Sequence, residues 1–331
     1  MSFTNIGIVG AGGWGTALAL LLHENNFPIT LWGHDPLEVA LVAERRENVV
    51  YLPGIPLPES FRYTSDLDDL AVCDLLVLVL PSKAMREVSA RLSTVALRPD
   101  AVLLTCTKGV ERGSGMRMSE IVAEFFPTHA IAALSGPSHA EEVARQAPTA
   151  VAIAATDATV AQRLQQAFTT RFFRAYTNDD VAGIELGGAL KNIFALAAGV
   201  CDGLGLGDNT KAALVTRALA EMTRVGVALG GRRETFHGLS GIGDLMVTCF
   251  SQHSRNRKVG ERLGRGESLG AITASMQMIA EGVPTTYSAH ECARKHGLDT
   301  PIIDQMRALL DGATAPRDAL AALLSREPKQ E

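Results

Sequence analysis

Short apolar runs alternate with amphipathic stretches over the first half of the chain. The apolar runs predict strands at residues 6–9, 29–32, 75–80, 101–105, 131–134 and 150–154. The stretches between them repeat apolar residues with helical spacing and predict helices at 16–24, 37–46, 84–92, 115–126 and 158–168. Several runs are apolar throughout, which is typical of strands covered on both faces. The alternation predicts βαβ units that build a parallel sheet.

The pattern changes near Asp179, beyond which it is almost entirely helical. We expect loops at 202–209, 230–244 and 264–270, and a last helix near 302–310. The boundary falls within 178–190, so we divide the chain into domains 1–180 and 181–331. The predicted fold class is an α/β N-terminal domain with a mostly parallel sheet, followed by an all-α C-terminal domain.

One apolar stretch, residues 186–206, has the length of a membrane span. It carries Lys191, Asn192 and Asp202 together with several glycines. Charged groups are expensive in lipid, so we interpret this stretch as a buried helix and expect no membrane span.

Composition argues against three classes of protein: disordered chains, basic nucleic-acid-binding proteins and disulfide-rich secreted proteins. Of 331 residues, 47% are hydrophobic and 20% are charged, which is typical of a globular protein rather than a disordered one. The net charge of −5 provides no basic excess for binding nucleic acid. The five cysteines are scattered and odd in number, which favours a reducing compartment over a disulfide scaffold. The N-terminus lacks the pattern of a secretory signal.

A glycine-rich run directly follows the first predicted strand and precedes a helix. Residues 10–15 read GAGGWG and match the dinucleotide-binding pattern G-x-G-x-x-G. In that pattern Gly10 permits the tight turn, Gly12 lets the backbone approach a pyrophosphate, and Gly15 lets the helix pack on the strand. The helix start then offers free N–H groups to phosphate. The alternative is a glycine-rich turn that binds no ligand.

The end of the second predicted strand bears on the choice of cofactor. Asp35 stands where an acidic residue would bind the ribose 2′-hydroxyl of NAD, whereas His34 could meet the 2′-phosphate of NADP. A solvated loop histidine is the alternative for His34. The preference for NAD or NADP therefore stays open.

Two further segments follow predicted strands, where ligands of open parallel sheets bind. Lys108 follows the strand at 101–105 and could meet an anionic or carbonyl oxygen; the alternative is a surface lysine. Ser138 follows the strand at 131–134 and precedes a helix, and it is either a ligand contact or an N-cap.

Lys191 lies in an apolar helical pattern rich in small residues. A buried lysine is costly unless it is paired or functional, and burial favours its neutral amine, so Lys191 is a candidate general base. The alternative is a lysine whose amine reaches solvent. Asp244, in a glycine-rich turn, could orient such a lysine or could be an N-cap.

Ser254, Arg255 and Asn256 form a cluster of polar residues that opens a predicted helix at 256–263. Hydroxyl, guanidinium and amide donors at a helix start suit an anion; a solvated basic turn is the alternative. The histidines and cysteines lack the spacing of metal ligands, so no metal is expected.

From residue 6 to about 303 the chain closely resembles the bacterial NAD(P)-dependent glycerol-3-phosphate dehydrogenases. Seven ordered motifs carry the resemblance: residues 10–17 (GAGGWGTA), 107–109 (TKG), 134–138 (LSGPS), 188–192 (GALKN), 241–245 (GIGDL), 254–256 (SRN) and 281–282 (EG). The resemblance implies a Rossmann-type N-terminal domain. It also implies NAD or NADP as cofactor, and a cytoplasmic homodimer that supplies sn-glycerol 3-phosphate for glycerophospholipid synthesis.

The resemblance also implies residue roles. Lys191 is the expected general base, with Lys108 and Asp244 as its active-site partners. The implied substrate-binding set is Lys108, Gly136, Ser138, Lys191, Asp244, Ser254, Arg255 and Asn256. The cofactor set comprises Gly10, Gly12, Gly13, Trp14, Gly15, His34, Lys108, Ala140, Arg255, Ile279 and Glu281.

The implied reaction is reversible hydride transfer between NAD(P)H and dihydroxyacetone phosphate, whose phosphate would be held at residues 254–256. Two alternatives stay open. A β-hydroxyacid dehydrogenase would share the fingerprint and a helical second domain with a lysine, but it would act on a carboxylate. A non-catalytic dinucleotide sensor would bind the cofactor without needing both Lys108 and Lys191.

Overall fold

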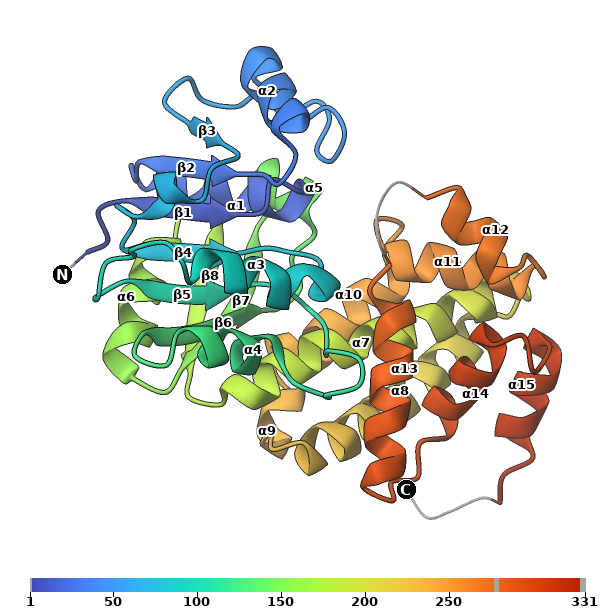
Figure 1. Ribbon diagram of the computed structural model, residues 1–331. Helices are drawn as coiled ribbons and strands as arrows, with labels where there is room; N and C mark the ends of the chain where they lie inside the picture. Colours follow the sequence, from blue (N-terminus) through green and yellow to red (C-terminus); the bar gives the residue numbers. More distant parts are fainter. Residues whose placement is uncertain (1, 277–279, 328–331) are drawn as a thin grey trace. The chain divides into compact units, whose positions relative to one another are not determined.

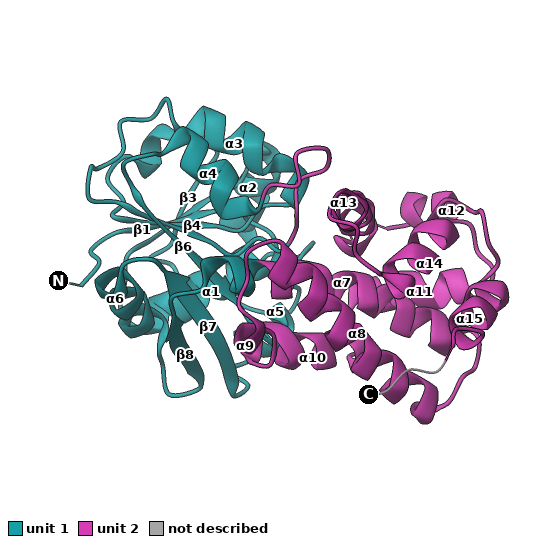
Figure 2. Cartoon of the chain, turned by 90° about the horizontal axis from the view of Figure 1, so that it is seen from below, with its two compact units in different colours: residues 1–108, 117–185 teal, residues 109–116, 186–331 magenta. Residues whose placement is uncertain are grey.

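The computed structural model describes residues 2–276 and 280–327. The chain forms two compact units, of which the first comprises Met1–Lys108 and Arg117–Glu185. The second comprises Gly109–Met116 and Leu186–Glu331 (Figure 2). The division of the chain into domains at residues 180 and 181 stays a prediction.

The first unit is built on one sheet in the order β3-β2-β1-β4-β5-β6-β7-β8. Neighbouring strands are parallel except β6 and β7, which are antiparallel. The strands are β1 (Ile6–Val9), β2 (Ile29–Trp32), β3 (Arg62–Thr64), β4 (Leu75–Leu78), β5 (Val102–Thr105), β6 (Ala130–Ser135), β7 (Thr149–Ala155) and β8 (Phe173–Asn178). The mostly parallel α/β sheet predicted from the apolar runs is thus confirmed.

Helices cover both faces of this sheet. They are α1 (Gly13–Glu24), α2 (Pro36–Arg45), α3 (Met85–Leu92), α4 (Met118–Phe125), α5 (Ala140–Ala144) and α6 (Ala158–Phe168). Figure 2 shows α3 and α4 on one face and α1 and α6 on the other. Every residue of β1, β4 and β5 is buried, which explains why these strands carry no charged side chain and only one polar one, Thr105 of β5.

The chain leaves β1 toward β2 on one side and reaches β4 on the other (Figure 1). The strand order therefore reverses at β1. In open α/β sheets this reversal leaves a crevice beyond the carboxyl ends of the strands, where ligands bind. The fold places the glycine-rich run after β1 at this point.

The second unit is helical, as the sequence pattern predicts. Its elements are α7 (Val181–Gly203), which begins in the first unit, α8 (Asp208–Ala228), α9 (Arg233–Phe236), a π-helical turn (Leu239–Gly243), α10 (Asp244–Phe250), α11 (Arg255–Gly264), α12 (Leu269–Ala274), α13 (Gly282–Lys295), α14 (Pro301–Leu310) and α15 (Pro316–Leu324). Helix α7 is long and apolar enough to cross a membrane, but its most apolar window is wholly buried in the protein. The interpretation as a buried helix is confirmed.

Three details of the sequence prediction are wrong. It omitted β3 and β8, which are edge strands with polar or alternating residues rather than apolar runs. The helix near 302–310 is not the last, because α15 follows it; Ala319 is the buried residue of α15. The expected loop 230–244 contains α9 and the π-helical turn. These elements are short or exposed, so their hydrophobic signal is weak.

Candidate functional site

The glycine-rich run forms a tight loop between β1 and α1. Gly10 adopts φ +128°, and a Cβ there would lie 2.3 Å from the carbonyl oxygen of Val79. A Cβ on Gly15 would lie 1.9 Å from the carbonyl oxygen of Gly10. Both positions therefore require glycine for the loop itself.

Gly12 differs because a Cβ there would meet no atom within 4 Å. This open space, next to the first N–H groups of α1, fits the approach of a dinucleotide pyrophosphate. The neighbouring Trp14 has a buried indole N–H with no hydrogen-bond partner among the described residues. A Cβ on Gly13 would lie 3.9 Å from the Cβ of Ala140, so the fold brings the start of α5 beside the loop.

Asn48, a residue that sequence reasoning missed, supports this loop. Its side chain is buried, and its Nδ2 donates to the carbonyl oxygen of Ala11 and to the hydroxyl of Thr16, each at 2.9 Å. The Thr16 hydroxyl donates in turn to the carbonyl oxygen of Gly12 at 2.9 Å. No sequence motif marks Asn48, because it meets the loop only through the tertiary fold.

The residues after β2 take different positions. His34 is exposed. Asp35 caps α2: its Oδ1 accepts from the backbone N–H of Leu37 at 2.8 Å and of Glu38 at 3.4 Å. The Asp35 carboxylate thus has a structural task in the helix start.

Lys108 and Ser138 meet at one carbonyl group at the carboxyl end of the sheet. The half-buried Lys108, after β5, donates from Nζ to the carbonyl oxygen of Gly136 at 3.1 Å. The hydroxyl of Ser138, after β6, donates to the same oxygen at 2.9 Å. The N-cap expected at Ser138 is wrong: His139 occupies the N-cap position of α5, without a side-chain capping bond. The Ser138 hydroxyl instead shares the Gly136 carbonyl oxygen with the Lys108 amine.

The second unit contains a buried ion pair between Lys191 on α7 and Asp244 at the start of α10. The Lys191 amine donates to Asp244 Oδ1 and to the hydroxyl of Thr248 at 2.7 Å. Lys191 is 6% exposed and Asp244 is 1% exposed. The alternatives of a lysine amine in solvent and an aspartate N-cap are therefore wrong, since Asp244 is the first residue of α10 and pairs with Lys191.

Glycines bring this pair together. A Cβ on Gly187 of α7 would lie 2.5 Å from the carbonyl oxygen of Ser240 in the π-helical turn. A Cβ on Gly241 would lie 2.0 Å from the carbonyl oxygen of Phe236. The backbones therefore approach closely enough for the Lys191 amine to reach Asp244. Burial raises the pKa of the neighbouring Cys249 thiol to about 12, although the charge of Lys191 opposes the shift.

A second polar network lies one residue along α7. Asn256, on α11, donates from Nδ2 to Asn192 Oδ1 at 2.9 Å and accepts at its own Oδ1 from the backbone N–H of Gly282 at 2.8 Å. Glu281 immediately precedes this start of α13. The fold thereby joins α7, α11 and the beginning of α13. Asn192 and Thr248 are contacts that the sequence analysis did not assign to the site.

The residues expected to bind an anion, Ser254, Arg255 and Asn256, lie at the beginning of α11. Ser254 is its buried N-cap, and the Ser254 hydroxyl accepts from the backbone N–H of Arg257 at 3.2 Å. Arg255 is exposed, whereas Asn256 is buried. Ile279, predicted as a cofactor contact, lies outside the described residues. Within residues 2–276 and 280–327 no cluster of histidine, cysteine, aspartate or glutamate is arranged to hold a metal ion.

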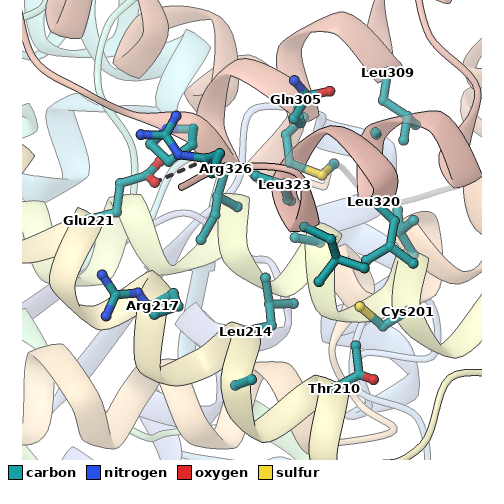
Figure 3. A pocket seen from close by; sticks show the side chains of 18 of the residues that line it. Cys201, Thr210, Leu214, Arg217, Glu221, Gln305, Leu309, Leu320, Leu323 and Arg326 are labelled. Atoms are coloured by element: carbon teal, nitrogen blue, oxygen red, sulfur yellow. Dashed lines mark hydrogen bonds between the residues drawn. The ribbon is translucent and has the colours of Figure 1, made fainter. Parts of the chain in front are cut away.

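A cavity of about 470 Å³ lies elsewhere in the second unit, among α7, α8, α14 and α15 (Figure 3). Its lining is mostly apolar and includes Leu214, Leu309 and Leu320. None of the predicted site residues lines it. Its polar part includes Glu221, whose carboxylate accepts from the backbone N–H groups of Ile302 and Ile303 at 3.0 and 2.8 Å.

Known proteins and family models match this chain over nearly its whole length. The models for the N-terminus and the C-terminus of NAD-dependent glycerol-3-phosphate dehydrogenase match residues 5–161 and 180–321. A glycerol-3-phosphate dehydrogenase [NAD(P)+] from Syntrophotalea carbinolica is 47% identical over 331 residues, which is 99% of either chain. The same enzyme from Geobacter sulfurreducens is 46% identical over 330 residues, or 98% of either chain.

Solved structures agree with these relatives. A glycerol-3-phosphate dehydrogenase from Coxiella burnetii has a TM-score of 0.94 at 38% identity, covering 98% of this chain and 99% of that one. A ketopantoate reductase from Ralstonia eutropha has a TM-score of 0.61 at 16% identity, over 96% of this chain and all of the other, and is similar in fold alone. The chain therefore belongs to the NAD-dependent glycerol-3-phosphate dehydrogenase family.

Proposed function

We propose that the protein is an NAD(P)-dependent sn-glycerol-3-phosphate dehydrogenase, which reduces dihydroxyacetone phosphate reversibly to sn-glycerol 3-phosphate. The buried Lys191–Asp244 pair carries this proposal. A charged amine placed in an apolar helix costs free energy, so its retention beside a carboxylate and a hydroxyl favours a chemical role. The names of the relatives give the reaction class.

A bound nicotinamide would supply the hydride for C2 of the substrate, and residues of this chain transfer the proton. The Lys191 ammonium donates a proton to the oxygen that develops negative charge at C2. In the reverse direction the neutral amine accepts the hydroxyl proton. Asp244 and Thr248 orient the amine through their hydrogen bonds. Lys108 stabilises the charge on the same oxygen.

Substrate and cofactor positions follow the predicted sets. Ser254, Arg255 and Asn256 bind the substrate phosphate, because hydroxyl, guanidinium and helix N–H groups together suit a dianion. Gly136 and Ser138 complete the substrate contacts next to Lys108. The loop at residues 10–15 binds the cofactor pyrophosphate, with His34, Ala140, Arg255 and Glu281 as further contacts.

The proposal extends to the cell. The enzyme would act in the cytoplasm as a homodimer and supply sn-glycerol 3-phosphate for glycerophospholipid synthesis. These expectations rest on the family resemblance of the sequence motifs.

A spectrophotometric assay tests the activity. Dihydroxyacetone phosphate is added to enzyme with NADPH, and separately with NADH, and loss of the reduced nicotinamide absorbance is followed. Oxidation that depends on the substrate supports the proposal, and the ratio of the two kcat/KM values determines the cofactor preference. Folded protein that binds cofactor but oxidises neither would contradict it. A 2-oxo acid that replaced the phosphate substrate would instead favour a hydroxyacid dehydrogenase.

A further inference from the structure

Helices α7 and α11 pack backbone against backbone through glycines. A Cβ on Gly260 of α11 would lie 1.9 Å from the carbonyl oxygen of Leu196 on α7. A Cβ on Gly264 would lie 2.6 Å from the carbonyl oxygen of Val200. No side chain larger than hydrogen fits at either position without a shift of the backbone.

The register of this contact is regular. Asn256 contacts Asn192, Gly260 meets Leu196 and Gly264 meets Val200, so each pair is separated by the same interval in the sequence. The two helices therefore run parallel in one register. Because α7 carries Lys191, this register sets the distance between the proton-transferring amine and the first turn of α11.

An ion-pair cluster, formed by Asp202, Lys211 and Arg257, holds the register near the end of α7. The Asp202 carboxylate accepts from Arg257 Nε at 2.6 Å and forms an ion pair with the Lys211 amine. All three side chains are at most 17% exposed, so solvent screens them less than a surface pair. Lys211 also lies over the ring of Phe250, with its amine 5.3 Å from the ring centroid.

Arg257 connects this cluster to the proposed phosphate site. Its backbone N–H donates to the hydroxyl of Ser254, while its guanidinium is held by Asp202. Asn256, between them, is fixed by Asn192 and by the backbone of Gly282. The first turn of α11 is therefore anchored by side chains on both sides of Arg255.

We propose that Asp202 and Arg257 are positioning residues that hold the first turn of α11 in register on α7, and thereby set the preference for substrates that carry a phosphate. This inference rests on the proposed function and deepens it. Neither residue touches the substrate. They align Ser254, Arg255 and Asn256 so that these residues bind the phosphate together.

The test compares Arg257→Gln and Asp202→Asn with wild type on two substrates, dihydroxyacetone phosphate and dihydroxyacetone. We expect KM for dihydroxyacetone phosphate to rise about tenfold or more, with kcat changed less than about threefold. We expect kcat/KM for dihydroxyacetone, which lacks the phosphate, to stay within about twofold. Inhibition by inorganic phosphate should weaken in parallel with KM. Lys258→Gln, an exposed neighbour on α11, is the matched control and should resemble wild type.

Arg257→Lys keeps the charge and should recover part of the affinity, and it replaces Arg257→Gln if that variant fails to fold. In the double variant the two losses should be less than additive, because each single substitution already breaks the same pair. An unchanged KM for dihydroxyacetone phosphate would overturn the inference. So would an equal loss with both substrates, since that indicates general damage. Wild-type protein inactive on dihydroxyacetone phosphate would instead contradict the proposed function itself.

Discussion

At the scale of single residues, buried charge is the most informative feature of this protein. Lys191 and Asp244 are both withdrawn from water, and the ion pair must offset the loss of hydration. Removing one partner leaves the other charge buried and unpaired. The pair is therefore sensitive to substitution both in stability and in the proposed chemistry.

We expect Lys191→Ala to lower kcat by about a thousandfold or more, because the group that donates the proton to the substrate oxygen is removed. Binding of NAD(P)H, measured by fluorescence titration, should stay close to wild type. Lys295→Ala, which removes an exposed lysine on α13, serves as the control. Near-normal turnover of Lys191→Ala would show that the proton comes from elsewhere.

Glu221 gives a prediction about pH. Burial raises its pKa from 4.5 to about 7, although the backbone N–H groups of Ile302 and Ile303 lower it. The folded protein therefore binds a proton between pH 4.5 and 7 that the unfolded chain releases. This contribution to the free energy of unfolding is complete below about pH 4.5, falls as pH rises, and is lost above about pH 7.

Urea unfolding at pH 5 and pH 8 measures this dependence. We compare the free energy of unfolding at pH 5 minus that at pH 8. Glu221→Gln has no ionisable group at this position, so this value should be lower in the variant than in wild type, because the stabilisation at pH 5 is lost. Glu234→Gln, an exposed residue of α9, should leave the difference unchanged. An identical pH dependence in Glu221→Gln and wild type would contradict the raised pKa.

At the scale of elements, the loop between β1 and α1 contains glycines with two different roles, one in packing and one in ligand binding. Gly15 is required for packing, because a Cβ there would meet the carbonyl oxygen of Gly10. Gly12 faces open space, so only a ligand would be displaced by a side chain. The same residue type thus has a structural and a binding role within one turn.

We expect Gly15→Ala to lower the free energy of unfolding by about 2 kcal/mol or more, since the backbone must move to admit the methyl group. Gly12→Ala should keep wild-type stability but weaken NAD(P)H binding by about tenfold or more. Chemical denaturation and fluorescence titration of both variants measure the two effects. Equal destabilisation by both substitutions would contradict the assignment of a packing role to Gly15 and a binding role to Gly12.

Prediction of elements from the sequence succeeded where burial is complete. The apolar runs at β1, β4 and β5 are buried in every residue, and their positions were predicted within two residues. It failed at β8, where Phe173 and Ala175 face the core while Arg174 and Tyr176 do not. One face of β8 is exposed, so buried and exposed residues alternate along the strand and leave no continuous apolar run.

At the scale of the whole molecule, the family resemblance predicts a homodimer. Light scattering coupled to size-exclusion chromatography should give twice the mass of one chain, independent of loading across the micromolar range. The same measurement with saturating NAD(P)H would show whether the cofactor changes the assembly. A single-chain mass at the highest concentration would contradict the prediction.

The sequence by itself determined the α/β and all-α halves, the glycine-rich loop and the candidate residues Lys108, Lys191 and Asp244. It could do so because periodicity, glycine spacing and an isolated charge in an apolar helix are local features. Only the tertiary structure decided that Lys191 pairs with Asp244 and Thr248, that Asn48 supports the loop, and that Asp202 holds Arg257. These contacts join residues far apart in the chain, and the partner of a buried polar group depends on which backbones the glycines allow to approach.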